Sequence, residues 1–317
     1  MKTAIGIDIG GTKIAIGVVQ EDGKVLATNE FPTRVEYGPD YATDLIVSCV
    51  EEFMQQFPTV TGIGIGAPGP LDSKQGKVLN PPNLKSWHGY PLARRIGSAF
   101  RVPVKMLNDA DAATFGEYFF TFRDTYKHVL YVTVSTGVGG GIIINSSLYE
   151  GALSGAGEIG HSVVQREGPV CGCGKQGCLE ALASGTALNR IWKERMAAVG
   201  KPVDPNWNSK DLFAHFDKND PIAQSVVEEA STHLALGLSQ VIQALNPELL
   251  ILGGGVIIGQ PSFYEMVYEK LPSYLLDQHS QLLTIEKARH GTLAGVMGAA
   301  AIILSKDEDI GGKQNGI

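Results

Sequence analysis

The chain has 317 residues, of which 44% are hydrophobic and 19% charged, as in an ordinary globular protein. Its length predicts two lobes, and its net charge of −7 argues against a surface for nucleic acid or anionic membrane. No apolar run approaches the length of a membrane span, and the first residues lack a signal-peptide pattern, so we expect a cytoplasmic protein.

The chain begins with two predicted strands, 4–9 and 14–19, joined by Gly10-Gly11-Thr12-Lys13. Glycines let a turn approach phosphate oxygens, which backbone N–H groups and the Thr12 hydroxyl can bind. Gly-Gly also makes plain hairpin turns, and the residues alone leave these two interpretations even. Asp8, just before the turn, is placed to hold a water or a metal–nucleotide complex.

A third strand is predicted at 25–31, a helix at 41–57 and a buried strand at 61–66. Gly64, Gly66 and Gly69 match G-x-G-x-x-G by count, but prolines bracket Gly69 where a helix must begin, which excludes a dinucleotide-binding motif. Gly69 is either a point of close backbone approach to a ligand or a simple turn.

Asn108 and Asp109 stand between a predicted strand, 102–107, and a predicted helix, 109–118. A carboxylate at the end of a strand can act as general base toward a hydroxyl, with the asparagine as a hydrogen-bonding partner. Either residue can equally serve as a helix N-cap, and the local pattern favours the cap.

The plan of strand, glycine turn and strand then repeats at 129–134, 136–141 and 142–144, which suggests a duplicated architecture with one phosphate turn in each half. A helix is predicted at 222–245, a strand at 248–252 leading into Gly253-Gly254-Gly255, and a helix at 293–304. The polar stretch 201–219 reads as a loop. The alternation of strands and helices predicts an α/β fold.

Three of the four cysteines lie near one histidine, in a stretch that also carries Glu158 and Glu180. One imidazole and three thiolates are a complete tetrahedral set for structural zinc, which leaves no open position for a catalytic water. The two carboxylates are suited to hydrogen-bond the vicinal hydroxyls of a polyhydroxy ligand. The four zinc-ligand candidates are His161, Cys171, Cys173 and Cys178.

Taken in order, these motifs resemble the ROK family of repressors, open reading frames and sugar kinases, from about residue 4 to about residue 304. The resemblance implies an ATP-dependent sugar kinase with an α/β, actin-like (ribonuclease-H-like, duplicated), two-lobed fold. It also implies a small lobe of residues 1–115 and 295–317 and a large lobe of residues 116–294. The motifs are IDIGGTK, GAPGPLD, NPPNL, LNDADAA, STGVGGG, EIGH, CGCGKQGCLE and GGGV.

The resemblance assigns roles residue by residue. Asp109 is the catalytic base, and His161 serves both zinc and sugar. Magnesium is expected to arrive with ATP. The sugar-binding set is Gly69, Asn83, Asn108, Asp109, Glu158, His161 and Glu180. The nucleotide-binding set is Asp8, Gly10, Gly11, Thr12, Lys13, Thr136, Gly137, Gly254 and Gly255.

The motif forms are most similar to those of bacterial glucokinases, so the expected reaction is phosphorylation of glucose at its 6-hydroxyl. An N-acetylmannosamine or N-acetylglucosamine kinase and a non-catalytic sugar sensor are the alternatives. Only three residues precede the first predicted strand, so we expect no DNA-reading helices. The family resemblance favours a homodimer. Pro82 lengthens the N-P-P-N-L run relative to many relatives and can shift the loop that carries Asn83.

Overall fold

The computed structural model describes residues 1–81, 84–152 and 154–306. The chain divides into unit 1, made of Met1–Lys127, Gly141–Gly157 and Arg289–Ile317, and unit 2, made of His128–Gly140 and Glu158–Ala288. Residues 116–127, 141–157 and 289–294 group with unit 1, whereas the predicted large lobe includes them; the lobe assignment stays a prediction. In the described ranges, no helix combines the length and apolar character needed to cross a membrane.

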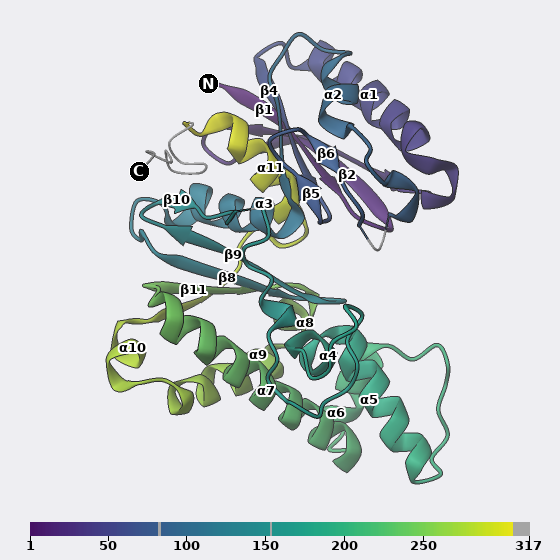
Figure 1. Ribbon diagram of the computed structural model, residues 1–317, viewed down its shortest axis with the longest axis vertical. Coiled ribbons are helices and arrows are strands. Elements are labelled where there is room, and N and C mark those ends of the chain that lie inside the picture. The colour runs from purple at the N-terminus through teal and green to yellow at the C-terminus, as the bar shows by residue number, and fades with distance from the viewer. Residues whose placement is uncertain (82–83, 153, 307–317) are drawn as a thin grey trace. The chain divides into compact units, whose positions relative to one another are not determined.

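Unit 1 is built on a five-stranded mixed sheet with the order β3-β2-β1-β4-β7 (Figure 1). The first three strands form an antiparallel meander, and β4 and β7 then add in parallel to β1. The parallel strands β1, β4 and β7 therefore end at the same edge of the sheet. The strands are β1 (Thr3–Ile9), β2 (Lys13–Gln20), β3 (Val25–Pro32), β4 (Val60–Ala67) and β7 (Val104–Asn108).

One face of this sheet packs on α1 (Gly38–Gln56) through alternating residues such as Ile5 and Ile7, whose burial is complete. The helix begins three residues before the predicted position because Pro39 occupies its first turn, where a missing N–H costs nothing. Alternation along the strand places Ala4 and Gly6 on the opposite face. Short elements complete this side: α2 (Leu92–Gly97), β5 (Leu71–Asp72), β6 (Lys77–Val78) and the 3₁₀ turns Val35–Tyr37 and Lys85–Trp87.

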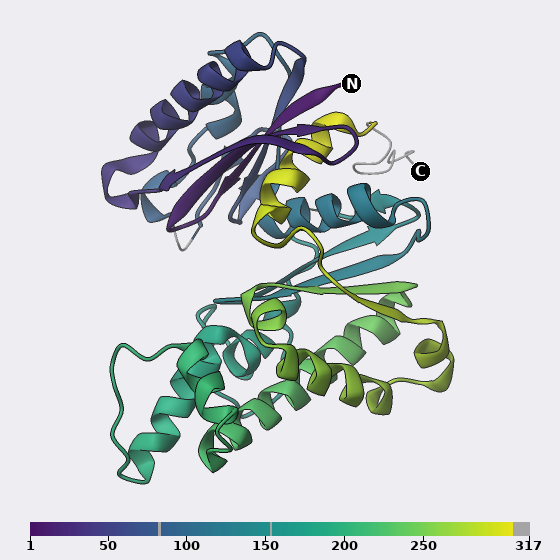
Figure 2. The ribbon, with the colours of Figure 1, turned by 180° about the vertical axis from the view of Figure 1, so that it is seen from behind.

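The opposite face packs on α11 (Ala294–Leu304), which lies beside the strands in both views (Figure 2). This contact is backbone against backbone. A Cβ on Gly6 would overlap the carbonyl oxygen of Val296, and one on Gly64 would overlap that of Ala299. Glycine in the two central strands is thus a packing requirement, and it brings the last helix directly onto the sheet.

Helix α3 (Asp109–Glu117) crosses α11 equally closely, since a Cβ on Gly298 would overlap the carbonyl oxygen of Ala112. A π-helical turn, Tyr118–Phe122, continues α3. The buried Glu117 carboxylate accepts the N–H groups of Arg289 and His290 at 2.8–3.0 Å. These bonds fix the segment that leads through the 3₁₀ turn Gly291–Leu293 into α11.

The second sheet has the order β10-β9-β8-β11-β12, the same plan of three successive strands followed by two more. β11 pairs in parallel with β8 and with β12, as β4 does with β1 and β7. The predicted duplication is therefore present in the topology. The strands are β8 (Val129–Val134), β9 (Val138–Ile144), β10 (Ser147–Leu148), β11 (Leu249–Gly253) and β12 (Thr284–Lys287).

Unit 2 carries most of the helices (Figure 1). The longest, α7 (Pro221–Leu245), starts at the Asp220 cap and ends at Asn246 in the left-handed conformation, as the Asn-Pro ending predicts. The others are α4 (Leu179–Ala183), α5 (Gly185–Ala198), α6 (Ser209–Phe216), α8 (Gly255–Gly259), α9 (Pro261–Lys270), α10 (Asp277–Leu282) and the 3₁₀ turns Ile159–His161 and Leu271–Tyr274.

The interpretation of 201–219 as a loop is wrong for its second half, which is α6. Asn208 and Asp211 form a capping box, with each side chain accepting the other residue's backbone N–H. Leu212 and Phe213 are buried one turn later, so the helix is held by packing as well as by its cap.

Packing of α11 on the sheet generates a stability prediction. Replacing Gly64 by alanine should destabilise the protein by at least about 1–3 kcal/mol, because the Cβ meets backbone that cannot rotate away. Chemical denaturation measures the change. Gly259→Ala is the control: nothing lies within 4 Å of its added Cβ, so stability should hardly change. Equal stability of the two variants would contradict the packing argument.

Candidate functional site

The turn between β1 and β2 is stabilised by hydrogen bonds to its own carbonyl oxygens. The Gly10 N–H donates to the Lys13 carbonyl oxygen at 2.9 Å, which closes the turn. Thr33 lies just after β3, and its hydroxyl donates to the Gly10 carbonyl oxygen at 2.7 Å. The Thr33 N–H donates to the Thr12 carbonyl oxygen at 3.0 Å. Because these bonds use carbonyl groups, the turn is braced without engaging the Gly11 and Thr12 N–H groups that would bind a phosphate.

The Lys13 ammonium pairs with the Glu30 carboxylate of the neighbouring strand at 2.6 Å. Both side chains are about half exposed, and such pairs contribute at most about 1 kcal/mol. A phosphate at the turn can therefore compete for this lysine.

Asp8 is the residue of β1 that lies opposite Gly66 of β4, close to the edge where the parallel strands end. Its carboxylate touches Gly295 near the start of α11, where a Cβ would overlap it. The pKa of Asp8 is raised to about 6, mainly by burial and also by the nearby Asp109, while Lys13 opposes the shift. A carboxylate kept charged in such a place at neutral pH is suited to bind a cation or a hydrated one.

Asn108 and Asp109 occupy the end of β7 and the start of α3, and the predicted cap is real. The Asn108 side-chain oxygen accepts the N–H groups of Ala110 at 2.8 Å and Asp111 at 3.4 Å. Burial raises the pKa of Asp109, and hydrogen bonding from the Ala110 N–H opposes that shift. The cap therefore belongs mainly to Asn108, which orients the helix start so that Asp109 presents a carboxylate of raised pKa.

Gly69 is brought against this pair, as a Cβ on it would lie 3.0 Å from the Asn108 amide nitrogen. The structure thus places three of the predicted sugar-binding residues of unit 1 together at the ends of β4 and β7. The fourth, Asn83, lies outside the described residues together with Pro82.

The four predicted zinc ligands in unit 2 converge, with all their ligand atoms within 4.8 Å of one another. The Cys173 and Cys178 sulfurs are 3.7 Å apart, and the Cys171 sulfur is 3.6 Å from His161 Nδ1. Zinc bonds of about 2.3 Å to sulfur and 2.0–2.1 Å to nitrogen give tetrahedral edges of about 3.5–3.8 Å. The donor set and its spacing therefore fit a structural zinc ion.

Without a cation two of the three thiols are costly to ionise, because burial raises the pKa of Cys171 and of Cys178. The pKa of Cys178 is raised to about 12 by burial together with the neighbouring Cys173 and Cys171. A bound metal would supply the positive charge that stabilises three thiolates. Such an ion would fix the loop between His161 and Cys178.

His161 turns its other ring nitrogen outward. Nε2 lies 3.9 Å from a carboxylate oxygen of Glu158, so the imidazole has one nitrogen in the cluster and one beside a predicted sugar-binding group. Glu180, in the first turn of α4, lies 3.8 Å from the Cys171 sulfur through Oε1. Glu158, His161 and Glu180 are therefore all anchored at or next to the cluster.

The second glycine turn joins β8 to β9 and contributes to a cavity of about 660 Å³ within unit 2. Thr136 and Gly255, two of the predicted nucleotide-binding residues, line this cavity. Gly254, the neighbour of Gly255, packs against the end of β8: its φ is +88°, and a Cβ there would overlap the Val134 carbonyl oxygen. A volume of this size is within the range of small-molecule sites.

The far wall of this cavity, which was not predicted from the sequence, comes from α5, α6 and the segment after α8. The wall is mostly polar, with amide, hydroxyl and ammonium groups that can bind a nucleoside. The capping-box pattern Asn208-x-x-Asp211 was the signal that a helix begins there. The missed lining residues are Thr186, Asn189, Asn208, Ser209, Lys210 and Gln260.

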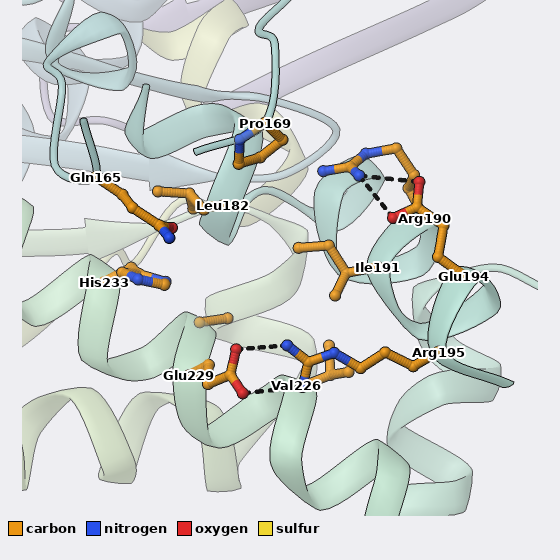
Figure 3. A pocket seen from close by; sticks show the side chains of 11 residues that line it. Gln165, Pro169, Leu182, Arg190, Ile191, Glu194, Arg195, Val226, Glu229 and His233 are labelled. Carbon is orange, nitrogen blue, oxygen red and sulfur yellow. Dashed lines mark hydrogen bonds and ion pairs between the residues drawn. The ribbon is translucent and has the colours of Figure 1, made fainter. Parts of the chain in front are cut away.

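A second, smaller cavity of about 280 Å³ lies in unit 2 between α5, α7 and the loop that joins His161 to Cys171 (Figure 3). Its charged walls are internally paired, Arg190 with Glu194 and Arg195 with Glu229. Burial lowers the pKa of His233, which favours its neutral form. The cavity has no excess charge of either sign.

Comparison with known proteins identifies the class. The ROK family model matches residues 4–306. A glucokinase of Thermotoga maritima is 32% identical over 97% of this chain and 98% of its own. An N-acetylmannosamine kinase of Haemophilus influenzae is 33% identical over 96% and 97%, respectively.

Among solved structures, a ROK family glucokinase from Streptomyces griseus in complex with glucose and AMPPNP matches with a TM-score of 0.80 and 33% identity. The match covers 95% of this chain and 98% of that one. This chain belongs to the ROK family, and its expected α/β, actin-like fold is confirmed. The expected homodimer and cytoplasmic location stay predictions.

Burial of Asp8 predicts a pH-dependent stability. The folded state holds its proton up to a pH of about 6, the unfolded chain only to about 3.8, so stability from this group is lost as pH rises between them. Asp8→Asn should therefore be more stable than the wild type by up to about 3 kcal/mol at pH 7.5 and similar to it at pH 4. Denaturation at both pH values tests this. The exposed Asp124→Asn is the control, and a pH-independent gain in Asp8→Asn would contradict the assignment.

The cysteine cluster predicts one zinc ion per chain. Cys173→Ser should reduce zinc content well below one equivalent after desalting, since a hydroxyl is a poor replacement for a thiolate. Elemental analysis gives the content, and calorimetry should show weaker sugar binding by the variant. Cys49→Ser, which lies outside the cluster, should keep its zinc. Full zinc occupancy in Cys173→Ser, or none in the wild type, would refute the site.

Proposed function

We propose that this ROK-family sugar kinase transfers the γ-phosphoryl group of ATP to the 6-hydroxyl of glucose. The observation that carries the proposal is the Asp109 carboxylate at the start of α3. Burial raises its pKa, and Asn108 and Gly69 lie beside it. The glycine turn of β1 and β2 belongs to the same unit, so that unit has both a candidate base and a candidate phosphate-binding turn.

Asp109 would act as the general base. A carboxylate with a raised pKa holds a proton better at neutral pH than an exposed one, which favours its accepting the proton of an attacking hydroxyl. The other sugar-binding residues would hold the ring by hydrogen bonds: Gly69, Asn83, Asn108, Glu158, His161 and Glu180. Asn83 remains a prediction from the sequence alone.

The nucleotide would bind through both glycine turns. Gly11, Thr12 and Lys13 would contact phosphate oxygens in unit 1, and Thr136 and Gly137 would do so in unit 2. The 660 Å³ cavity lined by Thr136 and Gly255 would take the adenosine. Magnesium bound with ATP would offset the charge of the transferring group, with Asp8 as the carboxylate available near the first turn.

The sugar is the least constrained part of the proposal. Relatives of nearly equal identity carry the names glucokinase and N-acetylmannosamine kinase, so the second activity is a specific alternative. The two sugars differ at the 2-position, where an N-acetyl group needs more room than a hydroxyl. A non-catalytic sugar sensor is a further alternative, although such a protein needs neither Asp109 nor two phosphate turns.

The test is ADP release from Mg-ATP with glucose, mannose, fructose, N-acetylglucosamine and N-acetylmannosamine. We expect the highest kcat/KM with glucose. A preference for an N-acetylated sugar would replace the substrate and keep the reaction. Sugar binding without ADP release, by protein that contains zinc, would favour the sensor.

Asp109→Asn is the companion variant. Its amide oxygen can still accept the Ala110 N–H, so the helix start should be retained while the base is lost. We expect kcat to fall at least about 100-fold with sugar binding largely preserved, because positioned bases typically contribute about 10²–10⁴-fold. Near-wild-type turnover would contradict the role of Asp109.

A further inference from the structure

The Glu180 carboxylate contacts the second glycine turn directly. Its Oε2 accepts the backbone N–H of Val138 at 3.1 Å, and a Cβ on Gly137 would overlap the same oxygen. The absence of a side chain at 137 is therefore what lets this carboxylate reach the turn. A residue predicted from the family resemblance to bind sugar is thus in contact with a turn predicted to bind phosphate.

The same turn is held on both sides by backbone. The Gly185 N–H, at the start of α5, donates to the Ser135 carbonyl oxygen at 2.7 Å. On the other side, Gly160 packs so closely on Val138 that a Cβ would overlap the Val138 carbonyl oxygen. Gly160 lies between Glu158 and His161, so the segments that carry the unit 2 sugar-binding residues enclose residues 135–138.

Helix α4, which carries Glu180, has little freedom to shift. It begins directly after Cys178, and Leu182 is buried against the small cavity (Figure 3). The Arg190 guanidinium donates to the Ala181 carbonyl oxygen at 3.0 Å, and Glu194 holds that guanidinium in place with two further bonds of 3.0 Å. The Glu180 carboxylate therefore connects a fixed helix to the turn.

We infer that Glu180 couples the two substrates: a sugar bound at its carboxylate keeps the Glu180–Val138 hydrogen bond in place, which holds residues 135–138 in this conformation and so increases nucleotide affinity. The inference rests on the proposed function. A sugar hydroxyl that donates to Glu180 restricts the carboxylate, and the carboxylate in turn fixes the Val138 N–H and the path of the turn. Nucleotide then binds a turn that the sugar-bound carboxylate holds in one conformation, which gives positive coupling without a further contact.

Coupling is measured as the ratio of the dissociation constants of Mg-AMPPNP without and with saturating glucose. Couplings between sites are typically 5–150-fold, and we expect at least about 5-fold for the wild type. In Glu180→Ala the ratio should fall to about 1 while both ligands still bind. Because linkage is reciprocal, glucose affinity measured with and without AMPPNP must give the same ratio.

Three further variants separate coupling from simple sugar contact. Glu158→Ala should weaken glucose binding but keep the wild-type ratio, because within the described residues Glu158 makes no hydrogen bond to residues 135–138. Gly137→Ala, whose Cβ would displace the Glu180 carboxylate, should lower the ratio with Glu180 intact. Glu180→Gln should partly restore it, since its amide oxygen can still accept the Val138 N–H.

The outcomes are distinct. A wild-type ratio in Glu180→Ala, or a ratio of 1 in a wild type that turns over glucose, would overturn the inference. Loss of the ratio in Glu158→Ala as well would also overturn it, because coupling would then follow sugar contact in general. A wild type without sugar-dependent ADP release would refute the proposed function itself.

Discussion

Contact between backbones, made possible by missing side chains, is the constraint on which unit 1 depends. Gly6 and Gly64 admit α11 onto the centre of the sheet, and Gly298 admits α3 onto α11. The close approach sets where α11 begins, and that start places Gly295 against Asp8. It also sets the position of α3 relative to the sheet, and the first residue of α3 is Asp109. A packing rule thus positions both acidic groups of the candidate site.

The two glycine turns show how one topology is adapted twice. Each follows the first strand of a five-stranded sheet of the same order. The first turn is braced by Thr33, a neutral residue that binds carbonyl oxygens. The second is braced by Glu180, a charged residue that binds an N–H. The second turn therefore responds to whatever else binds the carboxylate, whereas the first is fixed by its own sheet.

The sequence predicted the repeated plan of strand, turn and strand because alternating apolar residues and paired glycines are local signals. It predicted the zinc cluster because its four ligands lie within 18 residues of one another, from His161 to Cys178. It missed the wall of the large cavity because Asn189 and Gln260 carry no local mark of a site. Only the packing of α5 and α8 brings them together.

Burial was also invisible to the sequence pattern. Nothing in the sequence around Asp8 and Asp109 marks their carboxyl groups as buried, and burial in the folded chain is the main cause of their raised pKa values. The Asn108 cap was predicted and is present, yet it did not exclude a functional role for its neighbour. Asn108 caps the helix and Asp109 remains available for another role, and residue preferences at helix ends cannot tell these two roles apart.

Closure of the first sheet by α11 has a consequence for the order of synthesis. Strand β1 precedes the other strands of its sheet in the chain, and the helix that covers it is made some 290 residues later. Until then one face of that sheet lacks its cover, although its other face can already pack on α1. Unit 2, whose segments lie between, can complete its own contacts first. The nascent chain must therefore hold an exposed apolar sheet face while the residues between β1 and α11 are made, which makes this face a target for chaperones.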